Sequence, residues 1–313
     1  MRALVTGTAG FIGSHLAEHL VDAGATVVGI DCFTDNYARP LKERNLERLC
    51  RAPRFSLVER PLADVNLPAL LADVTHVFHL AAQPGVRNSW GRDFRVYTVN
   101  NVEATQLLLE ACVGTPIERV VYASSSSVYG DEVSLPMRED VRPQPVSPYG
   151  VTKLAAEQLC YLYHVNHGVP TVSLRYFTVY GPRQRPDMGF TRFFSAVMHG
   201  RAVPMFGDGR QTRDFTFVAD AVAATTAAAT RGTPGGVYNI GGGSRVQLLD
   251  VFELIRQVTG RPLRIERLDP QRGDMRDTYA DTARARADLG FAPTVTLEQG
   301  LRAQYEWMTA GHD

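Results

Sequence analysis

The chain has 313 residues, 44% of them hydrophobic, which is enough to bury a large core in one large domain or two closely packed ones. Its 33 basic and 33 acidic side chains cancel, so no overall field attracts nucleic acid or an anionic membrane. No apolar run reaches the roughly 18 residues that span a bilayer, and the N-terminus enters a motif at once, unlike a signal peptide. The four widely spaced cysteines form no CxxC pair. We therefore expect a reduced, cytoplasmic protein without a metal site.

Short apolar runs alternate with amphipathic segments through the first half of the chain. The predicted strands are Ala3–Thr6, Thr26–Ile30, Phe55–Val58, His76–Leu80, Val120–Ala123 and Thr171–Leu174. Helical spacing is found between most of them, as in Phe11–Ala23 and Asp93–Cys112. This alternation predicts an α/β fold, with a doubly wound parallel sheet, right-handed crossovers and helices on both faces.

The first predicted strand ends in a glycine-rich turn with the spacing GxxGxxG. Gly7 allows the tight turn, Gly10 lets the backbone approach a pyrophosphate, and Gly13 lets the following helix pack closely on the strand. Phe11 and Ile12 open that helix, whose N–H groups and positive dipole would face the phosphates. A glycine-rich turn alone can be purely structural, but the order strand, turn, helix, second strand and acidic residue favours a dinucleotide site.

The acidic residue is Asp31, which ends the second predicted strand 18 residues after Gly13. A carboxylate at this position hydrogen-bonds a ribose 2′-hydroxyl and repels a 2′-phosphate. The sequence therefore predicts NAD, rather than NADP, as the cofactor.

A tyrosine and a lysine four residues apart open another predicted helix, Tyr149–Asn166. At this spacing Tyr149 and Lys153 share one face. A phenol titrates near pH 10, and a neighbouring ammonium should lower that pKa and make Tyr149 a usable base. The alternative is an ordinary amphipathic helix that happens to carry both residues.

Five segments together resemble the extended short-chain dehydrogenase/reductases, which include sugar-nucleotide epimerases and dehydratases. They are TGTAGFIGSH from Thr6, Asp31, HLAA from His79, SSSSVYG from Ser124 and SPYGVTK from Ser147. The resemblance covers essentially the whole chain. It implies that residues 1–175, with returning segments at about 214–240, form an NAD-binding Rossmann domain. Residues 176–313 would then form mainly a smaller, nucleotide-sugar-binding C-terminal domain.

The resemblance also assigns residues to the catalytic centre. Ser125 would hydrogen-bond the reacting hydroxyl, with Ser126 as the next candidate, and the segment Leu80, Ala81 and Ala82 would border the cofactor. Asn100 would support the active-site helix, although it is equally a candidate N-cap for the segment Val102–Cys112.

The serine run separates the chemistries within this superfamily. Related dehydratases carry Asp-Glu before Val-Tyr-Gly, and related UDP-glucuronate decarboxylases carry Glu just before that Val. Here Ser126 and Ser127 occupy these positions. Without extra acid and base groups, oxidation and reduction at a single carbon remains, which is epimerisation.

Arginine-bearing loops in the second half resemble those of UDP-glucuronate 4-epimerases. In that subgroup, residues at the positions of Thr178 and Arg185 hold the C6 carboxylate of the sugar, and Arg87 and Arg192 are further candidates. A 4-keto-uronate is a β-keto acid that readily loses carbon dioxide. Charge-assisted bonds to a planar guanidinium can hold the carboxylate out of alignment with the carbonyl. The alternative is that these arginines are solvated or bind phosphate.

The nucleotide end of the substrate is assigned by the same resemblance. Arg213 would bind the diphosphate, the Val203–Phe206 stretch the uracil, and Asp274 would lie near the uridine ribose. A departure occurs where many relatives carry an Asp that binds adenine. Here Pro61-Leu62 occupies the equivalent stretch and Asp64 lies slightly beyond.

The leading hypothesis is therefore an NAD-dependent UDP-glucuronate 4-epimerase. UDP-glucose 4-epimerase is the nearest alternative, followed by UDP-glucuronate decarboxylase. An NAD-binding redox sensor without catalysis is the non-enzyme alternative, which the pairing of Tyr149, Lys153 and Ser125 disfavours. The resemblance further implies a homodimer formed through Asp93–Cys112 and Tyr149–Asn166.

Overall fold

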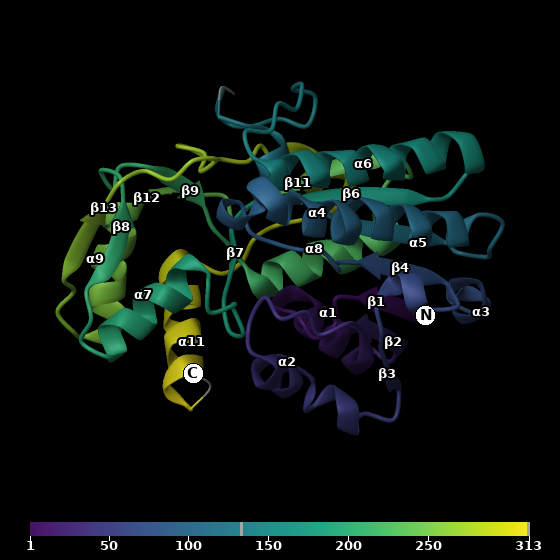
Figure 1. The fold of residues 1–313 in the computed structure, drawn as a ribbon, viewed down its shortest axis with the longest axis horizontal. Coiled ribbons are helices and arrows are strands. Elements are labelled where there is room, and N and C mark those ends of the chain that lie inside the picture. Colours follow the sequence, from purple (N-terminus) through teal and green to yellow (C-terminus); the bar gives the residue numbers. More distant parts are fainter. Residues whose placement is uncertain (132–133, 312–313) are drawn as a thin grey trace.

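Seven strands form one parallel sheet in the computed structural model, which describes residues 1–131 and 134–311 (Figure 1). The strand order is β3-β2-β1-β4-β5-β6-β11, and every neighbouring pair is parallel. The bounds are β1 (Arg2–Thr6), β2 (Thr26–Asp31), β3 (Phe55–Glu59), β4 (His76–His79), β5 (Arg119–Ser125), β6 (Thr171–Tyr176) and β11 (Gly236–Ile240). This order confirms the predicted doubly wound parallel sheet.

The strands are apolar because helices cover both faces of the sheet. All six residues of β6 are buried, as are four of the five residues of β1. Parallel sheets buried on both faces show such near-continuous apolar runs instead of alternation. The chain leaves the sheet after β6 and returns at β11, which pairs with β6 from Gly236 to Ile240.

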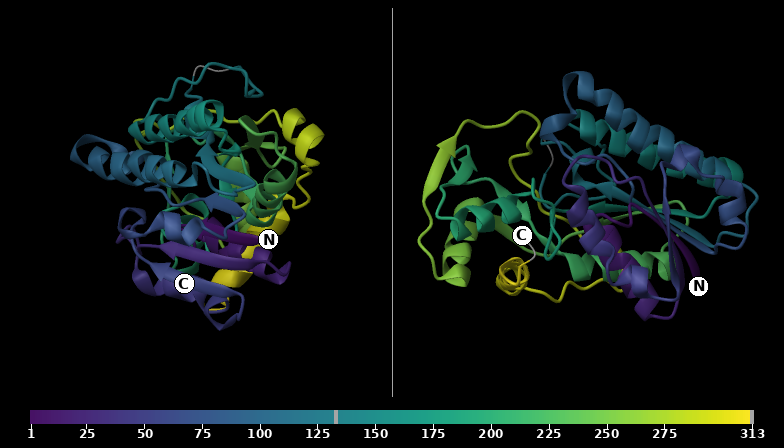
Figure 2. Two further views of the ribbon diagram at one scale, coloured as in Figure 1. Left: turned by 90° about the vertical axis from the view of Figure 1, so that its right-hand side faces the viewer. Right: turned by 60° about the horizontal axis from the view of Figure 1, so that its bottom comes forward.

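Two helical layers enclose the sheet (Figures 1 and 2). On one face lie α1 (Phe11–Asp22), α8 (Val218–Arg231) and α10 (Ala283–Leu289), whose buried residues share one hydrophobic core. On the other face lie α3 (Leu67–Leu71), α5 (Ala104–Cys112) and α6 (Pro148–His167), which share a second core. The short helix α2 (Arg39–Leu46) follows β2 at the edge of the sheet.

The predicted single helix Asp93–Cys112 is divided in the structure. It begins as α4 (Phe94–Tyr97), continues through a π-helical turn at Thr98–Glu103, and ends as α5. Such π-turns inside helices are frequent at functional sites. This turn faces the catalytic cleft described below.

The C-terminal lobe lies beyond the carboxyl ends of the strands and has its own core (Figures 1 and 2). Three small two-stranded sheets pair β7 with β10, β9 with β12, and β8 with β13. Their bounds are β7 (Val179–Tyr180), β8 (Val203–Phe206), β9 (Thr212–Asp214), β10 (Thr216–Phe217), β12 (Arg245–Gln247) and β13 (Ile265–Leu268). The helices are α7 (Gly189–Met198), α9 (Leu248–Thr259) and α11 (Leu297–Thr309). No helix in the described ranges is long and apolar enough to cross a membrane.

Candidate active site

A cleft of about 510 Å³ lies at the carboxyl ends of the strands and gathers residues from both halves of the chain. The predicted site residues that line it are Gly7, Gly10, Phe11, Ile12, Gly13, Asp31, Leu80, Ala81, Ala82, Asn100, Ser125, Ser126, Tyr149, Lys153, Thr178 and Arg185. Arg87, Arg192, Arg213 and Asp274 do not line this cleft and are described separately below. In open α/β sheets, ligands bind at this edge.

The glycine turn forms a cradle that side chains would fill. Gly7 has a positive φ of 73°, and a Cβ there would lie 2.8 Å from the backbone nitrogen of Ala81. A Cβ on Gly13 would lie only 2.1 Å from the carbonyl oxygen of Gly7, so the helix can approach the strand only without a side chain. The free N-terminus of α1 is thereby held at the cleft, where it suits a pyrophosphate. These residues fit the predicted dinucleotide.

Asp31 ends β2 with its carboxylate fixed by backbone donors. Oδ2 accepts from the N–H of Ala9 at 2.9 Å, and Oδ1 accepts from the N–H of Phe33 at 2.8 Å. Burial raises the pKa of this carboxyl, while the two backbone bonds and the charge of Lys42 oppose that rise. These hydrogen bonds fix the orientation of the Asp31 carboxylate at the wall of the cleft, where it can contact a ribose.

The loop after β4 is anchored by a buried histidine. The N–H of Ala81 donates to Thr6 Oγ1 at 3.1 Å, and Thr6 Oγ1 lies 2.7 Å from Nδ1 of His79. Nε2 of His79 lies 2.9 Å from Thr105 Oγ1, which donates to the carbonyl oxygen of Asn101 at 2.6 Å. Burial lowers the pKa of His79 to about 3, so the ring is neutral and serves to position this loop.

Asn101, rather than the predicted Asn100, supports the active-site helix. Its Oδ1 accepts from the N–H of Gln83 at 2.6 Å, and its Nδ2 donates to Oγ1 of Thr152 on α6 at 3.0 Å. Asn100 lines the cleft instead. The alternative of an N-cap is also wrong, because Asn100 lies inside the π-helical turn that joins α4 to α5. The turn shifts which of the two adjacent asparagines faces α6.

The N-terminus of α6 presents Tyr149 to the cleft. Ser147 caps the helix by accepting from the N–H of Gly150 at 3.1 Å, and Pro148 occupies its first position. Burial raises the pKa of Tyr149, and a hydrogen bond with Ser125 and the charge of Arg185 oppose that rise. The expected lowering of this pKa by Lys153 is therefore wrong: burial raises it, and the charge that opposes the rise is that of Arg185.

Lys153 follows Tyr149 by about one turn of α6 and is buried. Its Nζ lies 4.4 Å from the centroid of the Tyr122 ring. Burial lowers the pKa of Lys153 to about 7, against attraction to Cys160 and Glu157. At neutral pH the amine is therefore only partly protonated until an anionic or polar ligand stabilises the ammonium.

Glu157 on α6 connects this helix to two strands. It forms a buried ion pair with Arg175 on β6 and a hydrogen bond with Ser124 on β5, the strand that leads into the serine run. Glu157 accepts from Nη2 of Arg175 at 2.6 Å and from Oγ of Ser124 at 2.6 Å. Ser125 follows directly, and its Oγ accepts from the N–H of Ser127 at 3.1 Å. The positions of Ser125 and of the α6 residues are therefore fixed relative to one another.

Arg185 enters the cleft from the loop after β7. Its Nε and Nη2 each lie 3.0 Å from a carboxylate oxygen of Asp187, in a two-point pair. Only 18% of the Arg185 side chain is exposed, against 51% for Asp187. The guanidinium thus already holds a carboxylate, and its effect on the pKa of Tyr149 places it within electrostatic reach of the catalytic hydroxyl.

The remaining predicted substrate residues lie where the segment after β4, which carries Arg87, meets the C-terminal lobe. Nη2 of Arg87 lies 2.7 Å from Oδ2 of Asp274, and the Arg87 guanidinium carbon lies 4.0 Å from the centroid of the Phe206 ring. The guanidinium carbon of Arg192 lies 5.9 Å from the same centroid. Arg87 thus belongs with Phe206 and Asp274, and not with the sugar end of the cleft.

Arg213 lies in the same part of the molecule. Its Nη1 donates to the carbonyl oxygens of Thr212 and Arg276, both at 2.9 Å. Burial lowers its pKa, and attraction to Asp274 is the largest of the effects that oppose the shift. A half-buried guanidinium on β9 is a suitable group for a diphosphate.

Comparison with known proteins follows from this geometry. Residues 3–241 match the model of the NAD dependent epimerase/dehydratase family. The chain belongs to this family.

Three relatives show how complete the similarity is. The UDP-glucuronic acid 4-epimerase from Bacillus cereus, solved in complex with UDP-glucuronic acid and NAD, is 43% identical with a TM-score of 0.96, over 99% of each chain. An uncharacterized UDP-glucose epimerase of Bacillus subtilis is 43% identical over 99% of this chain and 98% of its own. A probable UDP-glucuronate 4-epimerase of Rhizobium meliloti is 36% identical over 98% and 96%.

Several cleft residues of this epimerase/dehydratase were not predicted from the sequence. Asn36, Tyr37 and Lys42 line the cleft beside Asp31. Their signal was their place directly after the second strand, where a cofactor ribose would lie. At the predicted adenine end Arg60, Pro61, Leu62 and Ala63 form the wall, whereas Asp64 is exposed and lies outside it.

Proposed function

We propose that this epimerase/dehydratase interconverts UDP-glucuronate and UDP-galacturonate by NAD-dependent oxidation and reduction at C4. The observation that carries the proposal is the setting of Arg185. A guanidinium able to hold a carboxylate at two points borders the same cleft as Tyr149, while Ser126 and Ser127 occupy the positions used by acids in dehydratases and decarboxylases. The bound complex of the similar Bacillus cereus enzyme supports the same substrate.

Each catalytic residue has a distinct task in this scheme. Tyr149 takes the proton of the C4 hydroxyl and later returns it, Ser125 hydrogen-bonds the same oxygen, and Ser126 is a second contact beside it. Bound NAD would supply the chemistry of accepting a hydride from C4 and giving it back. Lys153, protonated against the ribose of that cofactor, would favour the phenolate of Tyr149.

The cofactor would be held by the glycine cradle and Asp31. Gly7, Gly10 and Gly13 leave room for the pyrophosphate, and Phe11 and Ile12 begin the helix that faces it. The wall formed by Leu80, Ala81, Ala82 and Asn100 would border the nicotinamide half. Asp31 would bind the adenosine ribose and reject a 2′-phosphate.

Arg185 and Thr178 would select the uronate and protect it. Charge-assisted bonds to the C6 carboxylate hold the bond that decarboxylation would break out of alignment with the C4 carbonyl. The UDP moiety would extend into the C-terminal lobe. There Arg213 would bind the diphosphate, Phe206 and Arg192 would border the uracil, and Asp274, held by Arg87, would lie near the ribose.

UDP-glucose 4-epimerase remains the second candidate, favoured by the name given to the Bacillus subtilis relative. It differs by needing no carboxylate on the sugar. A decarboxylase is disfavoured by Ser126 and Ser127, and a redox sensor without catalysis has no use for Tyr149 next to Ser125.

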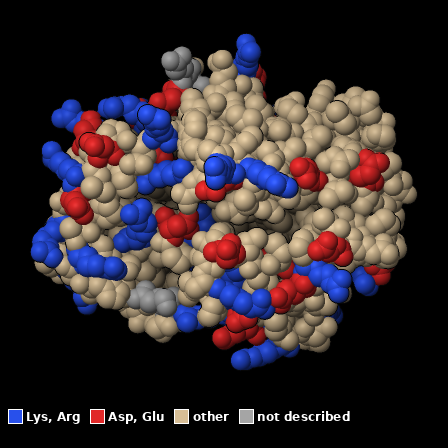
Figure 3. Space-filling view, in the orientation of Figure 1, with Lys and Arg blue, Asp and Glu red and all other residues tan. Residues whose placement is uncertain are grey.

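We also propose that the enzyme is a cytoplasmic homodimer. The helical segment from α4 to α5 and the helix α6 expose large apolar side chains. Val99 and Leu107 are exposed on the first, and Tyr161, Leu162 and Val165 on the second. The helices lie side by side, and the upper right of Figure 3 shows this region with few charges. An exposed apolar patch of this kind suits association with a second copy.

The test is nuclear magnetic resonance of the product formed from UDP-glucuronate with catalytic NAD. Appearance of UDP-galacturonate supports the proposal. A pentose product indicates decarboxylation, and turnover of UDP-glucose in preference to UDP-glucuronate would replace the uronate assignment. No turnover of any UDP-sugar would leave the redox sensor. Size-exclusion chromatography with light scattering tests the dimer separately.

A further inference from the structure

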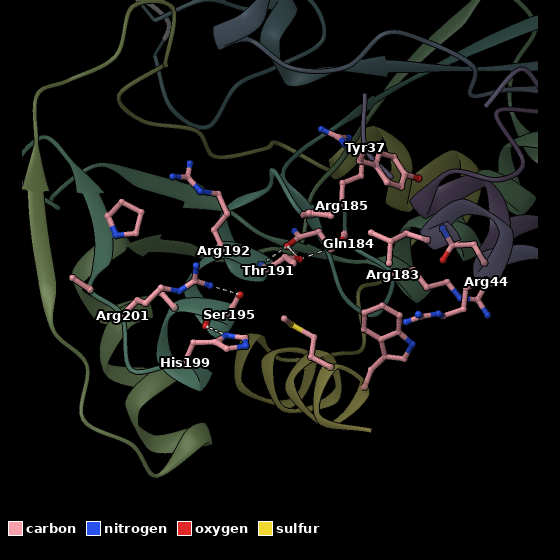
Figure 4. Close-up of a pocket in the computed structure, with 18 residues that line it drawn as sticks. Tyr37, Arg44, Arg183, Gln184, Arg185, Thr191, Arg192, Ser195, His199 and Arg201 are labelled. Atoms are coloured by element: carbon pink, nitrogen blue, oxygen red, sulfur yellow. Dashed lines mark hydrogen bonds between the residues drawn. The ribbon is translucent and has the colours of Figure 1, made fainter. Parts of the chain in front are cut away.

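A second cavity, of about 460 Å³, lies between the two lobes next to the loop that carries Arg185 (Figure 4). Its walls come from α2 of the sheet lobe and from α7, β8 and α11 of the C-terminal lobe. We call it the inter-lobe pocket. It shares only Tyr37 and Arg185 with the catalytic cleft, and Phe206, Arg87, Arg213 and Asp274 are absent from its walls.

The inter-lobe pocket is strongly cationic, although the chain as a whole carries no net charge. Five arginines line it, and no acidic side chain in residues 1–131 and 134–311 does so. The arginines are Arg44, Arg183, Arg185, Arg192 and Arg201. A concave wall with charges of one sign concentrates ions of the other sign.

Three of these arginines have no carboxylate partner among the residues that the structure describes. Arg44 contacts only the carbonyl oxygen of Gly311, at 3.4 Å, and Arg201 donates to Oγ of Ser195 at 3.0 Å. The guanidinium carbon of Arg192 lies 5.9 Å from the centroid of the Phe206 ring. The other two are paired, Arg183 with Glu18 and Arg185 with Asp187.

Two buried donors at the inter-lobe pocket also lack acceptors. The hydroxyl of Tyr37 and Nη1 of Arg183 are buried without a hydrogen-bond partner, and within the described chain only one other side-chain atom shares this condition. Buried donors are almost always satisfied, by the protein or by a bound molecule. The unpaired donors and the unpaired arginines both favour the same kind of ligand, an anion with several acceptor oxygens.

We propose that the inter-lobe pocket binds a small molecule that carries a phosphate or diphosphate group. Guanidinium groups match phosphate oxygens at two points, and the cavity has the size of a small-molecule site. Arg44 enters from the sheet lobe and Arg201 from the C-terminal lobe (Figure 4). Arginines of both lobes therefore border one pocket, which is separate from the catalytic cleft except at Tyr37 and Arg185.

The test is calorimetric titration of the Arg213→Gln enzyme with one equivalent of NAD bound, so that the cofactor site is filled and the proposed diphosphate contact of the substrate site is removed, while the inter-lobe pocket keeps all its arginines. Inorganic diphosphate is the first probe and ADP the second, because the two share a diphosphate group. ADP binding more tightly than inorganic diphosphate identifies a nucleotide as the ligand class, and equal affinity identifies the inorganic ion. The experiment uses no sugar substrate, so its outcome is independent of the proposed function.

Arg44→Gln and Arg201→Gln should each weaken diphosphate binding about tenfold or more, because each removes a charge-assisted hydrogen bond. Both variants should keep wild-type epimerase activity. Arg256→Gln is the matched control: Arg256 lies on α9, pairs with Glu253 at 2.7 Å, and lies outside the pocket. Absence of diphosphate binding to the Arg213→Gln enzyme overturns the proposal. Equal affinity in all four proteins also overturns it.

Discussion

The cofactor end and the substrate end of the cleft are held by contacts of different range. At the cofactor end Asp31 bonds the N–H of Ala9, 22 residues earlier, and the glycine turn rests on the adjacent strand. At the substrate end Arg87 pairs with Asp274 across 187 residues. The glycine turn and Asp31 therefore belong to one βαβ unit, which packs against the loop after β4 within the same lobe, whereas the Arg87–Asp274 pair exists only after the two lobes have docked.

The difference indicates how each end can vary. The cofactor end needs glycines and a carboxylate at fixed spacing, because backbone approach to a pyrophosphate tolerates little change. The substrate end consists of loop side chains on a common scaffold, where function commonly changes without altering the fold.

Replacement of Tyr149 by Phe tests the point where the two ends meet. The variant should lose about 10²- to 10⁴-fold in turnover, because only the proton-transferring oxygen is removed. Binding of NAD and UDP-glucuronate, measured by calorimetry, should stay close to wild type. Tyr161→Phe is the control, since Tyr161 lies on the exposed side of the same helix. Wild-type turnover in Tyr149→Phe would reject this residue as the base.

Arg185→Ala tests the substrate end. Loss of a charge-assisted pair in an enclosed site should weaken UDP-glucuronate binding roughly ten- to a hundred-fold. UDP-glucose binding should be unchanged, which serves as the internal control. Because the freed carboxylate can align with the carbonyl, some of the 4-keto sugar should lose carbon dioxide and give pentose signals by nuclear magnetic resonance. Unchanged uronate affinity together with no pentose would exclude Arg185 as the carboxylate contact.

Asp31 tests the cofactor end. The wild-type enzyme should bind NAD about tenfold or more tightly than NADP, through a ribose hydrogen bond and repulsion of the 2′-phosphate. Asp31→Asn should reduce the ratio of NAD affinity to NADP affinity. It should leave unchanged the preference for UDP-glucuronate, which depends on Arg185. Competition binding with the two cofactors measures the ratio. Equal affinity of the unmodified enzyme for both would mean that Asp31 does not contact the ribose.

Lys153 gives a pH-dependent stability effect in the chain without cofactor. Its pKa is about 7 in the folded chain and near 10.4 when unfolded, so the unfolded state binds more protons between these values. The Lys153 contribution should therefore become more favourable as pH rises through 7, by at most about 1.4 kcal/mol per pH unit. Urea unfolding gives the free energy of unfolding of wild type and of Lys153→Met. From pH 6 to 9, the difference between the two should change in favour of the wild type. A difference constant with pH would contradict the shift.

The fold brings together the site residues that were predicted from local spacing in the sequence. The glycine turn, Asp31, the serine run, Tyr149 and Lys153 all line one cleft. The predicted pair Asn100 and Asn101 shows where such inference fails. A π-helical turn that no spacing rule indicates makes Asn101 the residue that contacts Thr152. The pKa of Tyr149 likewise depends on burial by surrounding segments, which raises it, and on Arg185, a charge from a distant loop that the helix spacing does not indicate.

The sequence by itself determined the parallel sheet, the dinucleotide cradle and the residues at the start of α6, because strand periodicity, glycine spacing and helix geometry act over a few residues. Tertiary structure alone decided that Arg87 stacks over Phe206 beside Asp274, that Arg185 already grips Asp187, and that arginines from both lobes surround one pocket. The Arg87–Asp274 pair and the arginine-lined pocket join segments far apart in the chain, whereas Arg185 and Asp187 are two residues apart and are brought to the cleft together by the packing of their loop. Their geometry follows from how the lobes pack, and electrostatic effects at the site follow from the burial that this packing creates.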